Sequence, residues 1–63
     1  MKIIINGEGK EFEIKDLEGL LGALKLNLQT ILVEHNGVVV PQGNNINLSD
    51  GDRLELVRFI GGG

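Results

Sequence analysis

The chain has 63 residues, a formal net charge of −3 and no cysteine, so it suffices for one small domain and offers no thiol for disulfides, metal binding or nucleophilic attack. Its six basic residues are scattered, which argues against nucleic acid as the main partner, because phosphate binding needs clustered cations. No apolar run approaches the ~20 residues of a membrane span, and the N-terminus does not resemble a signal peptide. We therefore expect a soluble, cytoplasmic monomer.

The start of the chain is predicted to form a hairpin. Lys2 to Asn6 is expected as a strand, because its isoleucines are β-branched. Asn6 to Gly9 contains residues that tolerate a positive φ and predicts the turn. Lys10 to Ile14 is the predicted return strand, with apolar and acidic residues on opposite faces.

A leucine stripe predicts one helix after this hairpin. Asp16 is the expected N-cap, and leucines from Leu17 to Leu24 follow at the spacing i, i+3, i+4 and i+7. Gly19 and Gly22 each weaken the helix by up to about 1 kcal/mol relative to alanine, so its stability depends on packing of the leucines. Asn27 is the expected stop.

The second half of the chain predicts another hairpin. Ile31 to Asn36 and Val38 to Val40 are apolar strands joined by Asn36-Gly37, which is the strongest short hairpin signal in the sequence. Pro41 cannot donate to a ladder and ends the second of these strands.

A polar loop and a turn lead from that hairpin into the last strand. In the segment from Gln42 to Ser49, Ile46 and Leu48 are expected to return to the core. Asp50-Gly51-Asp52 predicts a turn, and Arg53 to Ile60 is the longest predicted strand.

The order β-β-α-β-β-β predicts an α+β fold of the ubiquitin-like β-grasp type, with a mixed sheet and one helix packed on one face. The first and last strands are expected to pair in parallel at the centre, since both are rich in apolar residues. We assign residues 1–60 to this domain and 61–63 to a flexible C-terminal glycine tail.

The last strand presents two faces. Leu54 and Leu56 are expected to face the helix, while alternate residues face outward and end in an apolar pair beside the glycines. An exposed apolar patch on a sheet marks a partner site, although Phe59 could instead fold over an edge of the sheet. The predicted docking residues are Val57, Arg58, Phe59, Ile4 and Leu32.

Gly61, Gly62 and Gly63 follow this strand as a tail without Cβ atoms. Such a tail can thread a narrow channel, and three extended residues reach at most about 10 Å. His35 is the only histidine and has no cysteine or carboxylate at metal-ligand spacing, so we expect no metal site. The one reactive group we expect is a free carboxylate on Gly63, in a protein that is not an enzyme.

Taken together, these features resemble the ThiS family of ubiquitin-like sulfur carriers in thiamin biosynthesis. The resemblance covers the whole chain, although the Asn-rich segment after Pro41 departs from the short helical turn expected in that family. The matching pieces are Asn6-Gly7, Leu17 to Leu24, Val33-Glu34-His35-Asn36-Gly37, Val40-Pro41, Asp50-Gly51-Asp52, Leu54-Glu55-Leu56-Val57 and Gly62-Gly63.

The resemblance implies chemistry that partner enzymes catalyse. A ThiF-like adenylating enzyme would use ATP to activate the Gly63 carboxylate, and a persulfide-bearing sulfurtransferase would convert the acyl-adenylate into a thiocarboxylate. That group would donate sulfur to a ThiG-like thiazole synthase. The chain itself would bind no cofactor.

Three alternatives stay open at this stage. A MoaD-like small subunit of molybdopterin synthase also ends in Gly-Gly. A ubiquitin-like modifier would conjugate Gly63 to lysines, and a plain β-grasp interaction module would carry its glycines incidentally.

Overall fold

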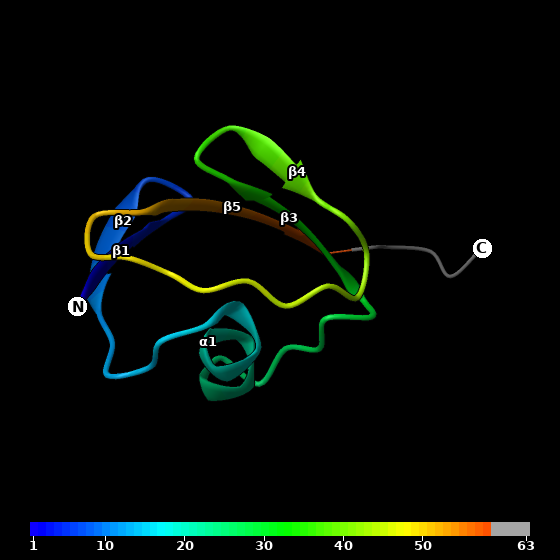
Figure 1. The fold of residues 1–63 in the computed structure, drawn as a ribbon, viewed down its shortest axis with the longest axis horizontal. Coiled ribbons are helices and arrows are strands. Elements are labelled where there is room, and N and C mark those ends of the chain that lie inside the picture. Colours follow the sequence, from blue (N-terminus) through cyan, green and yellow to red (C-terminus); the bar gives the residue numbers. More distant parts are fainter. Residues whose placement is uncertain (59–63) are drawn as a thin grey trace.

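A computed structural model describes residues 1–58. They form five strands and one helix in the predicted order (Figure 1). The predicted extension of the last strand to Phe59 and Ile60, and the glycine tail, lie outside the described residues. The elements are β1 (Lys2–Ile5), β2 (Glu8–Glu11), α1 (Leu17–Ala23), β3 (Ile31–His35), β4 (Val38–Val40) and β5 (Arg53–Arg58).

The sheet has the strand order β2-β1-β5-β3-β4, and α1 lies against one of its faces (Figure 1). β1 and β5 pair in parallel through Ile4↔Arg53 and Ile5↔Leu54, whereas the other neighbouring strands are antiparallel. The predicted α+β fold with central parallel strands is therefore confirmed.

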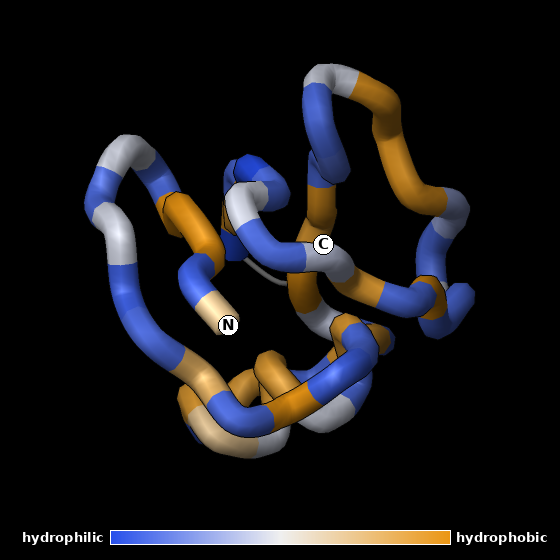
Figure 2. The backbone as a smooth tube through the Cα atoms, turned by 60° about the vertical axis from the view of Figure 1, so that its left-hand side comes forward, coloured by the Kyte–Doolittle hydropathy of each residue, from blue (hydrophilic) through white to orange (hydrophobic). Residues whose placement is uncertain are grey.

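The core lies between this sheet and α1. Alternation along β1 and β3 buries every second residue, and three leucines of α1 are at most 1% exposed. Figure 2 shows short hydrophobic segments that alternate along the chain with hydrophilic and neutral ones. The buried residues are Ile3, Ile5, Leu17, Leu20, Leu21, Ile31, Val33, Val40, Leu48 and Leu54.

The first hairpin has a tighter turn than the sequence predicts. Asn6 and Gly7 have φ values of 48° and 86°, so these two residues alone reverse the chain and Ile5 pairs with Glu8. β2 therefore begins two residues earlier than expected and ends at Glu11. Phe12, predicted within this strand, follows it and packs half-buried against the core.

The helix begins as predicted and ends earlier. The Asp16 carboxylate accepts a hydrogen bond of 2.8 Å from the Gly19 N–H, which confirms the N-cap. The helix ends at Ala23 with Leu24 as its C-cap, because Lys25 adopts a left-handed φ of 60°, and the Leu26 N–H then bonds back to the Leu21 carbonyl. The prediction of Asn27 as the stop was therefore wrong.

The loop after β4 closes the far end of the core. Leu48 is buried and Ile46 is half-buried, as predicted, and backbone bonds from the Leu48 and Leu17 N–H groups tie the loop to the start of α1. Gly51 has a φ of 87° and makes the predicted turn into β5. β5 thus starts from a fixed point beside β1.

Candidate functional site

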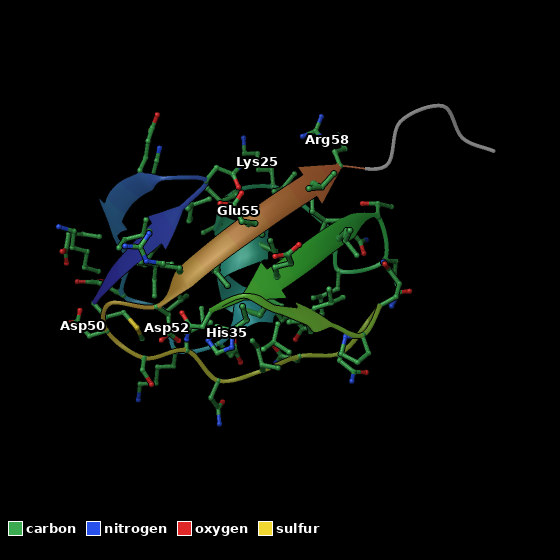
Figure 3. The ribbon with its side chains drawn as sticks, turned by 90° about the horizontal axis from the view of Figure 1, so that it is seen from above. Lys25, His35, Asp50, Asp52, Glu55 and Arg58 are labelled. Carbon is green, nitrogen blue, oxygen red and sulfur yellow. The ribbon has the colours of Figure 1, made fainter. Side chains whose placement is uncertain are left out.

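β5 is the central strand that leads toward the glycines. β3 flanks it from Ile31↔Arg58 to His35↔Leu54, while β1 flanks only its first two residues. Figure 3 shows β5 crossing the molecule diagonally, with Asp52 near its start and Arg58 at its end. The sheet therefore fixes the position and direction of β5 as far as Arg58.

A polar cluster holds the start of β5. The Asp52 carboxylate lies 2.7 Å from His35 Nε2 and accepts hydrogen bonds from the Ser49 N–H and the Asn36 amide (Figure 3). Partial burial raises the pKa of Asp52, but these hydrogen bonds together hold that pKa below its ordinary value. The Asp52 carboxylate therefore stays ionised at neutral pH, and its hydrogen bonds anchor the start of β5 to β3.

The outer face of the sheet is the face opposite α1. Val57 lies on it with 54% of its surface exposed, beside its cross-strand partner Leu32. Ile4 shares this face because its neighbours Ile3 and Ile5 point into the core. The structure thus brings three predicted docking residues onto one face.

Arg58 lies on the other side of β5. Alternation places it with Leu54 and Leu56 on the helix side, where it borders a groove also lined by Leu24. The predicted docking set is therefore divided between two faces. Phe59, Gly61, Gly62 and Gly63 lie outside the described residues, so their roles stay predictions.

The groove beside Arg58 has a volume of about 350 Å³. It lies where β1 has ended and where, within residues 1–58, no strand flanks β5 on that side. Sequence reasoning missed it, because its walls come from the first hairpin, the end of α1 and two strands. The lining residues are Ile5, Asn6, Lys10, Leu24, Leu26, Ile31, Leu56 and Arg58.

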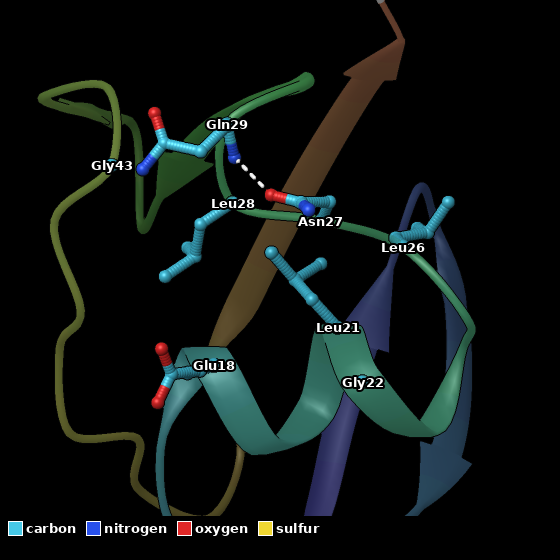
Figure 4. Close-up of a pocket in the computed structure, with 8 residues that line it drawn as sticks. All are labelled: Glu18, Leu21, Gly22, Leu26, Asn27, Leu28, Gln29 and Gly43. Atoms are coloured by element: carbon cyan, nitrogen blue, oxygen red, sulfur yellow. Dashed lines mark hydrogen bonds between the residues drawn. The ribbon is translucent and has the colours of Figure 1, made fainter.

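A second hollow of about 290 Å³ lies between α1 and the loop after β4 (Figure 4). Residues 26–29, which follow the helix, form one wall of this hollow. In this segment the Asn27 carboxamide accepts a hydrogen bond of 2.7 Å from the Gln29 N–H. Glu18 is its only ionisable lining residue, so it offers no acid–base pair. Among residues 1–58, no group of three His, Asp or Glu side chains could hold a metal.

The family model for the ThiS family matches residues 3–63. The chain belongs to the ThiS family. A solved structure of the thiamine biosynthesis protein ThiS from Geobacter metallireducens is 31% identical, with both chains fully covered and a TM-score of 0.68. This neighbour confirms the fold of the family for this chain.

Two curated relatives are named thiazole synthase, one from Paramagnetospirillum magneticum and one from Magnetococcus marinus. Each is 42% identical over 66 residues, and the match covers the whole of this chain. The chain spans 20% of the length of each relative. The ThiS-family segment in these relatives therefore belongs to a much longer polypeptide.

No described helix is long and apolar enough to cross a membrane. The free N-terminal ammonium of Met1 donates a 2.6 Å hydrogen bond to the Phe12 carbonyl, which ties the first residue to the chain just after β2. The candidate functional features of the described region are the outer face and the groove, one on each side of β5.

Proposed function

We propose that the chain is a sulfur carrier that serves enzymes as a protein co-substrate in the cytoplasm. Its Gly63 carboxylate would be adenylated, converted to a thiocarboxylate, and used as the sulfur donor for thiazole formation in thiamin biosynthesis. The observation that supports this most is the ThiS-family match, which extends through the three glycines to residue 63. The proposal requires a free carboxylate on Gly63.

The chemistry explains why the carrier needs no catalytic groups of its own. A ThiF-like enzyme joins the Gly63 carboxylate to AMP from ATP and releases pyrophosphate, which creates a good leaving group. The terminal sulfur of a sulfurtransferase persulfide then attacks the acyl carbon and displaces AMP. A second thiol cleaves the resulting acyl disulfide, forms a new disulfide itself and releases the thiocarboxylate.

Thiazole synthase is the proposed acceptor of this sulfur. The relatives that bear this name join a ThiS-family segment to a longer chain, which supports a functional link between the two. Conjugation of Gly63 to lysines is the alternative that the following experiment separates from a carrier. A carrier for molybdopterin synthase would form the same thiocarboxylate and differ only in the enzyme that accepts the sulfur.

Intact mass spectrometry of protein from its native cell tests the carrier function. A mass increase equal to the replacement of one oxygen by one sulfur supports a thiocarboxylate, whereas lysine conjugates would indicate a modifier. The intact mass is measured again after the purified chain has been incubated with ATP, the adenylating enzyme and a persulfide donor. An unchanged carboxylate under those conditions would show that the carrier proposal is wrong.

The outer face is the proposed docking surface for the adenylating enzyme. Val57, Leu32 and Ile4 present apolar side chains there, and Phe59 is the fourth proposed member. Arg58 is proposed to pair with acidic groups of a partner. Ordering a flexible tail in an active site costs affinity, so contacts of the folded domain have to offset that cost.

A pair of valine substitutions tests this docking surface. Val57→Asp should weaken binding to the adenylating enzyme by about tenfold or more, because it places a charge in an apolar contact. Val38→Asp is the matched control, since Val38 is 68% exposed and lies on the edge strand β4. Equal binding of both variants in titration calorimetry would contradict the proposal.

A further inference from the structure

The ladder between β1 and β5 ends at Asn6. The Leu56 N–H donates a 2.8 Å hydrogen bond to the Asn6 carboxamide oxygen, and the Asn6 amide donates to the Leu56 carbonyl at 3.4 Å. The Asn6 side chain therefore occupies the place that a further residue of β1 would take. Beyond it, this edge of β5 has no strand beside it within residues 1–58.

The register shows which backbone groups face that open edge. The Asn36 N–H bonds to the Arg53 carbonyl across β3 and β5, so the pairs 34↔55 and 32↔57 also share hydrogen bonds. The alternate residues Leu54, Leu56 and Arg58 direct their backbone groups away from β3. Arg58 thus presents its N–H and carbonyl to the groove, and no bond within the described chain reaches them.

The groove below this edge is apolar with a cationic rim. Its floor is formed by aliphatic side chains from β1, β3, β5 and the end of α1. Lys10 and Arg58 line it, and exposed Lys25 lies between the lining residues Leu24 and Leu26. No acidic residue lines it, although the chain as a whole carries a net charge of −3.

We propose that this groove binds an extended segment of thiazole synthase that carries an aliphatic side chain next to a carboxylate. The segment would pair with the backbone of Arg58, place the aliphatic group on the floor and direct the carboxylate at Lys10 and Arg58. This rests on the proposed function, because it takes thiazole synthase as the partner.

Three observations favour such a segment over other occupants. An open strand edge is satisfied by another strand, and side-chain pockets beside that edge give the pairing its specificity. The excess of cations at the rim fits an acidic partner. The groove borders the end of β5, so a segment held there would lie next to Arg58, the last described residue.

Amide hydrogen exchange measured by NMR tests the backbone pairing. The isotope-labelled full chain is titrated with purified thiazole synthase from the same source. We expect the Arg58 amide to exchange at least about tenfold more slowly in the complex, because it becomes hydrogen-bonded and buried. Continued fast exchange of Arg58 in a complex that perturbs Val57 and Leu32 would overturn the inference.

Charge variants test the rim of the groove. Lys10→Glu should weaken binding to thiazole synthase by about tenfold, and added salt should weaken wild-type binding more than that of the variant. Lys15→Glu is the matched control. Lys15 is also an exposed lysine, but it lies just before the start of α1, whereas the groove lies at the end of α1. Lys10→Gln removes the charge without reversing it. It therefore tests the same contact if the glutamate of Lys10→Glu disturbs β2.

The remaining outcomes are also decisive. Equal binding of the Lys10 and Lys15 variants to thiazole synthase would overturn the inference. It would also be overturned if the chain alone dimerised in sedimentation experiments and the Arg58 amide were protected from exchange in that dimer. Absence of binding to thiazole synthase overturns it too. The proposed carrier function is judged separately by formation of the thiocarboxylate, which does not depend on the groove.

Discussion

At the scale of single residues, two asparagines hold β5 from opposite sides. Asn6 and Asn36 both occupy the first position of a tight turn, with φ values of 48° and 51°. Their side chains then bond to β5, where Asn6 holds Leu56 on one flank and the Asn36 carboxamide oxygen accepts from the Arg53 N–H at 2.8 Å on the other. Each turn residue therefore also positions the central strand.

Asp52 gives a residue-scale prediction about pH. Its folded-state pKa lies below the ordinary value of 3.8, so its stabilisation is fully present above that value and is lost as the pH falls through the folded-state pKa. Asp52→Asn should lower the free energy of unfolding at neutral pH by about 1–3 kcal/mol, because it disturbs a partly buried hydrogen-bond cluster.

Urea unfolding measured at a series of pH values from neutral downward gives the free energy of unfolding of wild type and Asp52→Asn and so checks this prediction. The difference in the free energy of unfolding between wild type and Asp52→Asn should narrow below about pH 4, as the pH falls through the folded-state pKa of Asp52. Glu13→Gln serves as the control, since Glu13 is exposed and its side chain makes no hydrogen bond within residues 1–58. A difference that stays constant with pH would show that the carboxylate charge of Asp52 does not carry the effect.

At the scale of elements, the two faces of β5 differ in role. One face packs against the helix, and the other is exposed and contributes to the proposed docking surface. Leu54 and Leu56 pack toward the helix, whereas Glu55 and Val57 face solvent on the outer face. Glu55 lies directly opposite Glu34 on β3, and like charges in that arrangement destabilise a sheet. The outer face is therefore not optimised for stability.

Glu55→Gln should consequently raise the free energy of unfolding by about 0.2–1 kcal/mol at low ionic strength, because it removes the repulsion from Glu34. The gain should shrink as salt is added. Chemical denaturation at two salt concentrations measures it. Glu8→Gln is the control, since Glu8 pairs with Ile5, and an equal gain in that variant would contradict the explanation.

At the scale of the whole molecule, folding and the proposed chemistry involve different residues. Within residues 1–58, every buried or partly buried apolar residue of the core cluster lies at or before Leu56. The glycines that the proposed chemistry needs follow this region. We therefore expect that changes in the glycines can abolish the proposed sulfur transfer without unfolding the domain.

Deletion of Gly63 tests this separation. The melting temperature should change by less than about 2 °C, because the described core involves no tail residue. Thiocarboxylate formation, followed by intact mass, should be lost. Calorimetry of both proteins provides the stability measurement, and a clear loss of stability would mean that the tail contributes to the folded domain.

The sequence by itself determined the elements that local chemistry governs. Asp16 specified the helix start, the two Asn-Gly pairs specified the hairpins, and the apolar alternation in β5 assigned its faces, because these signals act over a few residues. The element order then limited the fold to few topologies. The predicted location of Val57, Leu32 and Ile4 on one outer face followed from this.

Other features were decided only by the tertiary structure. Lys25 ends the helix in a conformation that its residue type disfavours, because Leu26 must turn back toward the core. The bonds of Asn6 to Leu56 and the groove beside Arg58 depend on where β1 stops relative to β5. Such juxtapositions join residues about 50 positions apart, and no local pattern encodes them.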